Sequence, residues 1–253
     1  MHKFFAKTSF LGKNLISLPE CHSTNDFLIA MAKSESVTNG TIVQTESQIQ
    51  GRGQAGNKWE DSPGQNLIFS LYLSDLPIPI SQQYLLNLMT SIAVVETLDN
   101  YLGVGDKLEV KWPNDVYLND MKLAGILIES SVIGRSMEWM VVGVGINIGQ
   151  RSFKHPKATS LKLAGIDVDK WELLEEYCLR LESYLESDLS SISGLLSRYY
   201  QRLRWYEEDH QYKSPGHGLF SGRIVGIDSV GRLKIDTEKG IQTFDIKEVQ
   251  FIN

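Results

Sequence analysis

The sequence predicts an α+β fold, in which a larger domain of helices and strands is followed by a small all-β domain. First, apolar residues recur at three- and four-residue spacing in several long segments, which is typical of amphipathic helices. Second, short runs rich in β-branched and aromatic residues lie between turn signals and indicate strands. Third, the helical spacing stops after residue 209, and only strand-like runs follow. We therefore predict two domains, residues 1–209 and residues 210–253.

The first predicted elements are a helix and two strands joined by a long loop. Ser23 is placed as the N-cap of the helix, with Asp26 three positions later in a capping arrangement. Residues 41–45 (TIVQT) and 67–73 (LIFSLYL) are predicted strands. Between them, residues 48–66 hold four glycines and one proline, which predicts a loop.

The central part of the chain is predicted to form one long helix and several strands. The helix would start at a cap on Ser81 and run to about residue 102, with its apolar positions near one face: Leu85, Leu88, Ile92, Val95 and Leu102. Residues 108–147 then change to strand-like runs, VKW, DVYL, KLAGILIES and WMVVGVGIN, with a turn at residues 119–120.

The last part of the chain is predicted to hold two helices and the small β-domain. The helices cover residues 174–185 and roughly 192–208. A turn-rich link follows at residues 214–218 (SPGHG). Beyond it, the runs FSGRIVGI, RLKID and IQTFDI are separated by turn signals and indicate strands.

Composition is that of an ordinary globular protein, since 42% of the 253 residues are hydrophobic and 22% are charged. The net charge of −6 does not favour a broad nucleic-acid-binding surface, so we expect no nucleic-acid partner. Cys21 and Cys178 cannot build a disulfide framework or a CxxC metal site, which favours a reducing compartment. Residues 1–13 lack the continuous apolar core that a signal peptide has, and no apolar run approaches the roughly 18 residues that span a membrane. We therefore expect a cytoplasmic protein without a membrane partner.

Residues 51–56 match the glycine pattern GxGxxG, which by itself is a weak signal. A dinucleotide-binding fingerprint must open a helix, whereas residues 61–64 (DSPG) cannot continue one. A Walker loop is also disfavoured, because Asn57 separates Gly56 from Lys58.

The loop itself leaves two interpretations open. It is either a mobile surface connection or an anion-binding loop whose glycines permit close backbone approach. Arg52 favours the second, because its guanidinium matches phosphate or carboxylate. Trp59 would either stack on a ring or anchor the loop.

Two further motifs follow. Residues 111–115 (KWPND) would ordinarily form a turn, and Lys122 would ordinarily be a solvated edge lysine at the start of a strand. Gly125 inside that strand indicates a bulge or a closely packed ligand. In residues 143–147 (GVGIN), alternate glycines leave one face of a strand without side chains, which suits a flat ring lying against it.

Together and in this order, these motifs resemble the biotin–protein ligase family. The matching residues are Ser23, Thr24, Asn25, Gln48, 51–59, 111–115, 122–125 and 143–147, and with the small β-domain at the end the resemblance covers nearly the whole chain. Several motifs in register are much more specific than any one of them. The resemblance implies an α+β catalytic domain, a mixed sheet with helices related to class II aminoacyl-tRNA synthetases, followed by an SH3-like β-barrel. It also implies the short form of the family, without the N-terminal DNA-binding domain of repressor-type members.

The resemblance implies that biotin is activated by ATP with Mg²⁺ to biotinyl-5′-AMP and then transferred to a lysine of a biotin carboxyl carrier protein. The carrier would belong to acetyl-CoA carboxylase or another biotin-dependent carboxylase, and a homodimer is compatible with the sequence. One alternative is a lipoate or octanoate ligase or transferase, but a fatty acyl chain does not need Ser23, Thr24 and Gln48 around a polar ring. Another is a non-enzymatic sensor, which the retention of Arg52 and Lys122 argues against.

The resemblance also implies roles for individual residues. The implied catalytic residues are Lys122, Arg52 and Asp115, and Asp115 is also the candidate Mg²⁺ ligand through the ATP phosphates. The implied biotin-binding residues are Ser23, Thr24, Asn25, Gln48, Gly51, Arg52, Gly53, Lys122 and Gly125. The implied nucleotide-binding residues are Trp59, Lys111, Asn114 and Asn147. At Gln54 and Asn57 the commonest family loop has arginines, so fewer cations should face the phosphates.

Overall fold

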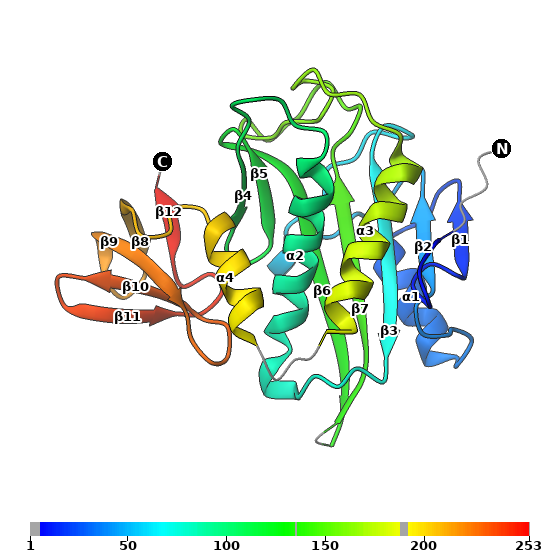
Figure 1. The fold of residues 1–253 in the computed structure, drawn as a ribbon, viewed down its shortest axis with the longest axis horizontal. Coiled ribbons are helices and arrows are strands. Elements are labelled where there is room, and N and C mark those ends of the chain that lie inside the picture. Colours follow the sequence, from blue (N-terminus) through cyan, green and yellow to red (C-terminus); the bar gives the residue numbers. More distant parts are fainter. Residues whose placement is uncertain (1–5, 135, 188–191, 253) are drawn as a thin grey trace.

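The computed structural model describes residues 6–134, 136–187 and 192–252, and the strands among them form two sheets (Figure 1). The larger sheet has the order β1 (Leu15–Leu18), β2 (Ile42–Thr45), β3 (Leu67–Ser74), β7 (Ser136–Ile146), β6 (Met121–Ile133), β5 (Asp115–Leu118) and β4 (Leu108–Lys111). β1 and β2 pair in parallel and the other neighbours are antiparallel, so the sheet is mixed, as predicted.

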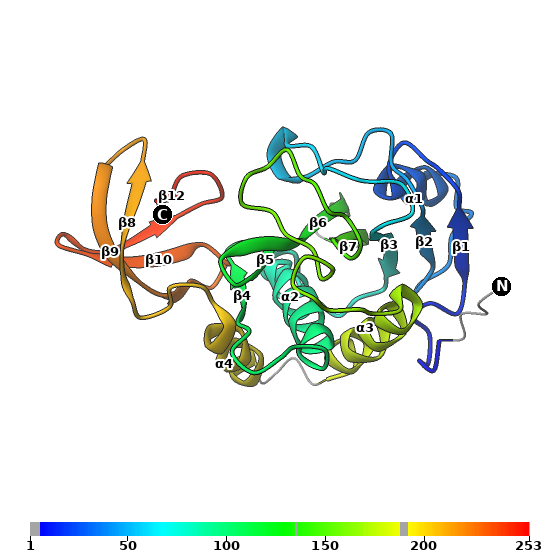
Figure 2. The same ribbon diagram turned by 90° about the horizontal axis from the view of Figure 1, so that it is seen from above.

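Helices cover both faces of this sheet (Figure 2). On one face, α1 (Thr24–Lys33) packs over β2, β3 and β7. On the other face lie α2 (Tyr84–Asp99), α3 (Lys170–Leu185) and α4 (Ile192–Arg202). The main hydrophobic core lies between these three helices and the sheet, where the rings of Phe69 and Tyr177 meet edge to face at 5.1 Å between centroids.

The predicted features of α2 need two corrections. The helix begins at Tyr84 rather than after Ser81, because a short 3₁₀ turn, η2 (Ile80–Gln82), precedes it and Gln83 takes the N-cap position. It was predicted to bury one face, whereas 12 of its 16 residues are buried. The reason is its central position, since α3, α4 and the sheet surround it.

Three strands escaped prediction, and one helix was predicted too long. The missed strands are short: β1, β8 (Asp209–Ser214) and β12 (Gln250–Ile252). The predicted helix of residues 192–208 ends at Arg202. Beyond it the chain turns, with positive φ at Trp205 and Glu207, and the backbone N–H of Arg204 bonds to Val110 on β4.

The smaller sheet is the predicted C-terminal β-structure. Its antiparallel strands follow the order β11 (Gly240–Phe244), β10 (Leu233–Thr237), β9 (Gly218–Ile227), β8 and β12. The indole of Trp112 donates to the carbonyl of Gly231, which ties this sheet to the larger one. β8 begins at Asp209, and the domain boundary at residues 209/210 stays a prediction. Within the described ranges, none of the helices has the length and apolarity that crossing a membrane requires.

Candidate active site

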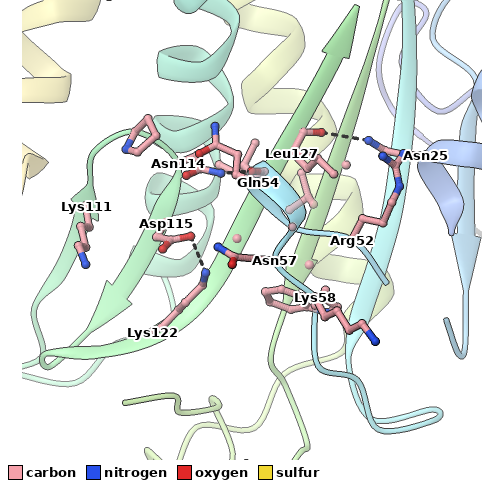
Figure 3. Close-up of a pocket in the computed structure, with 18 of the residues that line it drawn as sticks. Asn25, Arg52, Gln54, Asn57, Lys58, Lys111, Asn114, Asp115, Lys122 and Leu127 are labelled. Carbon is pink, nitrogen blue, oxygen red and sulfur yellow. Dashed lines mark hydrogen bonds and ion pairs between the residues drawn. The ribbon is translucent and has the colours of Figure 1, made fainter. Parts of the chain in front are cut away.

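A cavity of about 740 Å³ lies where α1, β5, β6 and β7 meet the glycine loop, which we define as residues 51–59 (Figure 3). Of the predicted site residues, the following line it: Ser23, Thr24, Asn25, Gln48, Arg52, Gly53, Trp59, Lys111, Asn114, Asp115, Lys122 and Gly125. Segments separated by about 100 residues in sequence therefore line one cavity, as residues that bind one ligand must.

One end of the cavity is lined by amide and hydroxyl groups at the start of α1. The backbone N–H and hydroxyl of Thr24 both donate to Oε1 of Gln48, at 2.8 and 3.2 Å. Ser23 occupies the predicted N-cap position, but its side chain makes no capping hydrogen bond, so that part of the prediction was wrong. Because the buried Ser23 hydroxyl does not cap the helix, it can serve a ligand in the cavity.

Asn25 is the buried link between α1 and the sheet. Its Nδ2 donates to the carbonyl of Leu127 at 3.2 Å and to Oε2 of Glu129 at 2.8 Å. Its Oδ1 accepts the hydroxyl of Ser70 at 2.6 Å. A Cβ at Gly143 would overlap this amide, which explains a glycine at that position.

Arg52 reaches across the mouth of the cavity to two carboxylates. Its guanidinium bonds to both oxygens of Glu129, at 2.9 and 2.7 Å, and to Oδ1 of Asp26 at 2.6 Å. The hydrogen bond with Glu129 raises the pKa of Arg52 above its usual value. Arg52 lines the cavity as predicted, but its charge is balanced by protein carboxylates.

The indole of Trp59 lies against Gly125 of β6 and Gly145 of β7, which are paired across the two strands. A Cβ at Gly145 would be 2.6 Å from ring carbons of Trp59, and one at Gly125 would be 3.0 Å away. The flat ring predicted to lie against the residues 143–147 motif is therefore supplied by the chain itself. The Nε1–H of Trp59 is buried and has no hydrogen-bond partner within the described ranges, which leaves a donor for a ligand.

Lys122 and Asp115 form the charged centre of the cavity. Lys122 Nζ lies 2.6 Å from Asp115 Oδ1, and the two side chains are 28% and 26% exposed. The backbone of Lys122 is held on both sides, since its N–H donates to residue 157 and its carbonyl accepts from Thr159. Lys122 is thus a partly buried residue of the cavity wall, and not a solvated edge lysine.

Lys111 is held between two aromatic rings. Its amine lies 5.5 Å from the ring centroid of Tyr117 and 5.1 Å from that of Phe251. Burial lowers the pKa of Lys111; Asp115 opposes this effect and Lys122 adds to it. Burial also raises the pKa of Tyr117 to about 12, so this ring stays neutral beside the lysine at physiological pH.

Three other predicted residues, Asn114, Gly51 and Asn147, differ in how they relate to the cavity. The side chain of Asn114 donates to the carbonyl of Ile126, and its own carbonyl accepts the N–H of Ile126, which holds residues 113–115 against β6. Gly51 and Asn147 are not among the cavity-lining residues. Asn147 donates to Thr159, while its Oδ1 is buried without a partner in the described part of the chain.

Comparison with known proteins agrees with this geometry. The model of the Biotin/lipoate A/B protein ligase family matches residues 18–147, just over half of the chain. The chain belongs to this family. It is 29% identical over 251 residues to the bifunctional ligase/repressor BirA of Bacillus spizizenii, covering 95% of this chain and 74% of that protein.

Two further family members bear on the site. The biotin–[acetyl-CoA-carboxylase] ligase of Mycobacterium tuberculosis is 29% identical over 217 residues, which cover 85% of this chain and 80% of that protein. The biotin protein ligase of Aquifex aeolicus, solved in complex with biotin and ATP, superposes with a TM-score of 0.75. It is 28% identical, and the match covers 95% of this chain and 99% of that one.

The predicted family residues do not account for the whole cavity wall. Strand β12 and the turn between β11 and β12 also contribute: Ile246, Lys247, Val249, Gln250 and Phe251. An apolar wall comes from the strands: Ile68, Phe69, Ile126, Leu127 and Val144. The first set lies about 100 residues beyond the last family motif and carries no motif of its own, so no signal in the sequence pointed to it.

Metal binding was predicted at Asp115. No group of three or more His, Cys, Asp or Glu side chains among the described residues could hold a metal ion. In proteins, Mg²⁺ that arrives on ATP phosphates typically needs only one or two carboxylates. Asp115, in the cavity beside Lys111 and Lys122, fits that requirement.

Proposed function

We propose that this chain is a biotin–protein ligase, which activates biotin with ATP and transfers it to a lysine of a biotin carboxyl carrier domain. The observation that carries the proposal is the distribution of groups in one cavity. Ser23, Thr24 and Gln48 lie at the α1 end, whereas Lys111 and Lys122 lie at the β5–β6 end. The first set suits a compact polar ring, and the second suits phosphates.

The α1 end would recognise the ureido ring of biotin. This ring carries two N–H donors and a carbonyl acceptor, and the hydroxyls of Ser23 and Thr24 can each donate or accept. Gln48 is held by Thr24, and its backbone N–H bonds to Asp61 at 3.1 Å, so its amide is already oriented. The remaining predicted biotin residues would shape the wall rather than bond the ring: Asn25, Gly51, Gly53 and Gly125.

In the first step, a biotin carboxylate oxygen attacks the α-phosphorus of ATP. The new O–P bond forms as the bond to the β-phosphate oxygen breaks, and pyrophosphate leaves. Lys122 and Lys111 would stabilise the negative charge on the phosphates, and Arg52 would neutralise the biotin carboxylate. Mg²⁺, when bound, supplies further charge neutralisation, with Asp115 as the residue that would hold it. Trp59 would stack near the adenine, and Asn114 and Asn147 would support the nucleotide.

In the second step, the amine of a carrier lysine attacks the acyl carbon of biotinyl-5′-AMP. A C–N bond forms, the anhydride C–O bond breaks, AMP leaves and the amine releases a proton. Asp115 would orient the amine once Lys122 has shifted to the phosphates. The glycine loop would protect the anhydride from water.

The acceptor would be the carrier of a biotin-dependent carboxylase, the class named for the Mycobacterium tuberculosis relative. A homodimer is compatible with this proposal, and the absence of a nucleic-acid partner stays a prediction. The net charge of −6 does not favour a broad nucleic-acid-binding surface, and the cavity chemistry supports the activation of a small molecule.

The test is ATP–pyrophosphate exchange with Mg²⁺ and either biotin, lipoate or octanoate. Of the three acids, we expect only biotin to support exchange, because the α1 end presents hydrogen-bonding groups that a fatty acyl chain cannot satisfy. Transfer would then be followed by mass spectrometry of a biotin carrier domain. Exchange with lipoate but not with biotin would overturn the substrate, and biotin binding without exchange would overturn the activity.

A further inference from the structure

Glu129 on β6 contacts two residues that belong to separate family motifs, Arg52 and Asn25. One carboxylate bonds bidentately to the guanidinium of Arg52, at 2.9 and 2.7 Å. The same carboxylate accepts Nδ2 of Asn25 at 2.8 Å. Arg52 belongs to the glycine loop and Asn25 to the first turn of α1, so Glu129 joins the loop to the biotin end.

The glycine loop is a short hairpin that this contact holds down. Arg52 and Lys58 form an antiparallel bridge, and Gly53 and Trp59 make backbone hydrogen bonds across it, at 2.8 and 2.9 Å. Three of the five guanidinium N–H groups of Arg52 are used by Glu129 and Asp26. The other two have no partner among the described residues, so Arg52 can bind Glu129 and still donate to a ligand anion.

We propose that Glu129 is a positioning residue, whose carboxylate holds Arg52 and keeps the glycine loop folded over the cavity. This rests on the proposed function only for its effect on catalysis. The contact is bidentate and part of a network with Asp26, which is the arrangement in which a partly exposed ion pair contributes measurably. Without it, Arg52 would lose its fixed direction and the loop would open more often.

The experiment measures loop opening in the ligand-free protein, by the rate of trypsin cleavage after Lys58. In Glu129→Gln we expect this rate to rise about fivefold, because local opening exposes the site. Cleavage after Lys239, in the exposed turn between β10 and β11, is the internal reference and should not change. The matched control is Glu138→Gln, an exposed carboxylate on β7 that bonds only to Ser131 among the described residues.

A double-variant cycle separates positioning from general destabilisation. Arg52→Gln should also raise cleavage after Lys58, and adding Glu129→Gln should raise it no further, because both remove one interaction. Additive effects, or a wild-type rate in Glu129→Gln, would overturn the proposal. If Glu129→Gln accelerates both cuts through unfolding, Arg52→Lys decides, because it removes the bidentate contact and leaves Glu129 bonded to Asn25. We expect acceleration at Lys58 alone, and a wild-type rate there would overturn the proposal.

A catalytic readout follows from the same variants. Glu129→Gln should raise the KM for biotin more than it lowers kcat in the exchange assay, since the misplaced Arg52 weakens ground-state binding. The cleavage measurement needs no substrate. Its outcome therefore stands even if the biotin activity proposed above fails.

Discussion

Lys122 and Asp115 face each other at 2.6 Å between Nζ and Oδ1, from neighbouring strands β6 and β5. The carboxylate holds the amine inside the cavity and leaves its other N–H groups free to donate to phosphate. When ATP binds, the amine can be shared between Asp115 and the phosphates, and so a preorganised cation acts in the transition state.

Lys122→Ala should slow adenylate formation by about 10²- to 10³-fold, because it removes a cation from the developing phosphate charge. The free energy of unfolding should fall by no more than about 1 kcal/mol, as expected for a partly exposed pair. Single-turnover formation of biotinyl-AMP and urea unfolding measure the two effects. The control is Lys162→Ala, which breaks the exposed pair with Asp167. Normal adenylation in Lys122→Ala would contradict the assignment.

Gly145→Ala should displace the indole of Trp59, because the new methyl carbon would lie 2.6 Å from two ring carbons. We expect ATP affinity to fall at least about tenfold, with a stability loss of about 1–3 kcal/mol from overpacking. Isothermal titration with ATP and thermal unfolding would show both. Gly194→Ala on α4 is the control, since its Cβ would meet nothing within 4 Å. Equal ATP affinity in the two variants would show that the position of the Trp59 ring against Gly145 does not matter for ATP binding.

Loss of the proton from Lys111 should lower kcat/KM for ATP at alkaline pH. Burial lowers its pKa below the usual value, so the cation is lost earlier than an ordinary lysine as pH rises. We expect kcat/KM for ATP to fall at a lower pH than the usual lysine pKa of about 10.4, and Lys111→Arg to flatten that fall because arginine stays charged. Lys213→Arg on β8 controls for a general effect. An unchanged alkaline limb in Lys111→Arg would assign it to another group.

The sequence predicted most strands of the larger sheet because the signals for single elements are local. Alternate glycines, a proline between strands and a polar helix start each constrain a few neighbouring residues. Twelve of the fourteen site residues that the family resemblance implies line the cavity, because the motifs that carry the resemblance lie on the elements that form its wall. The pairing of Arg52 with Glu129, 77 positions apart, and the approach of Phe251 to Lys111 depend on tertiary packing. No local pattern encodes those contacts.

Missed elements have the same cause. β12 has three residues, and its pairing with β8 is established only by the closure of the small sheet. The burial of α2 on nearly all sides follows from α3 and α4, which lie far along the chain. Its apolar spacing alone therefore indicated one buried face.

Glu182 should stabilise the N-terminal segment in a pH-dependent way. Burial acts to raise its pKa, but backbone N–H groups of residues 9–11 donate to the carboxylate and hold the pKa below its usual value. The stabilisation is therefore present above about pH 4.3 and is lost as pH falls through the lower folded pKa.

Glu182→Gln should lower the free energy of unfolding by about 1–3 kcal/mol at pH 7, with a smaller difference below about pH 4. Urea unfolding from pH 3 to pH 8 measures this. The control is Glu186→Gln, an exposed residue at the C-cap of α3. A difference from wild type that stays constant with pH would show that the charge of Glu182 is not responsible.

The last prediction concerns the glycine loop with ligand bound. Arg52 and Lys58 are exposed trypsin sites on a hairpin that covers the cavity, and the Nε1–H of Trp59 lacks a partner within the described ranges. A non-hydrolysable biotinyl-AMP analogue would fill the space below the indole and offer anionic oxygens to Arg52. Contacts made only in the bound state shift the loop toward its folded form. Cleavage after Arg52 and Lys58 should therefore slow, while cleavage after Lys239 should not.

Site-resolved cleavage kinetics by mass spectrometry give the result directly. Biotin alone should protect partly through Arg52, and ATP alone should protect less, because only the adenylate analogue fills both ends of the cavity. At saturating analogue we expect at least about tenfold protection, since loop opening is then opposed by the binding free energy. If the analogue binds tightly and both loop cuts keep the ligand-free rate, the hairpin does not close over the adenylate. Its glycines would then serve only to connect β2 to β3.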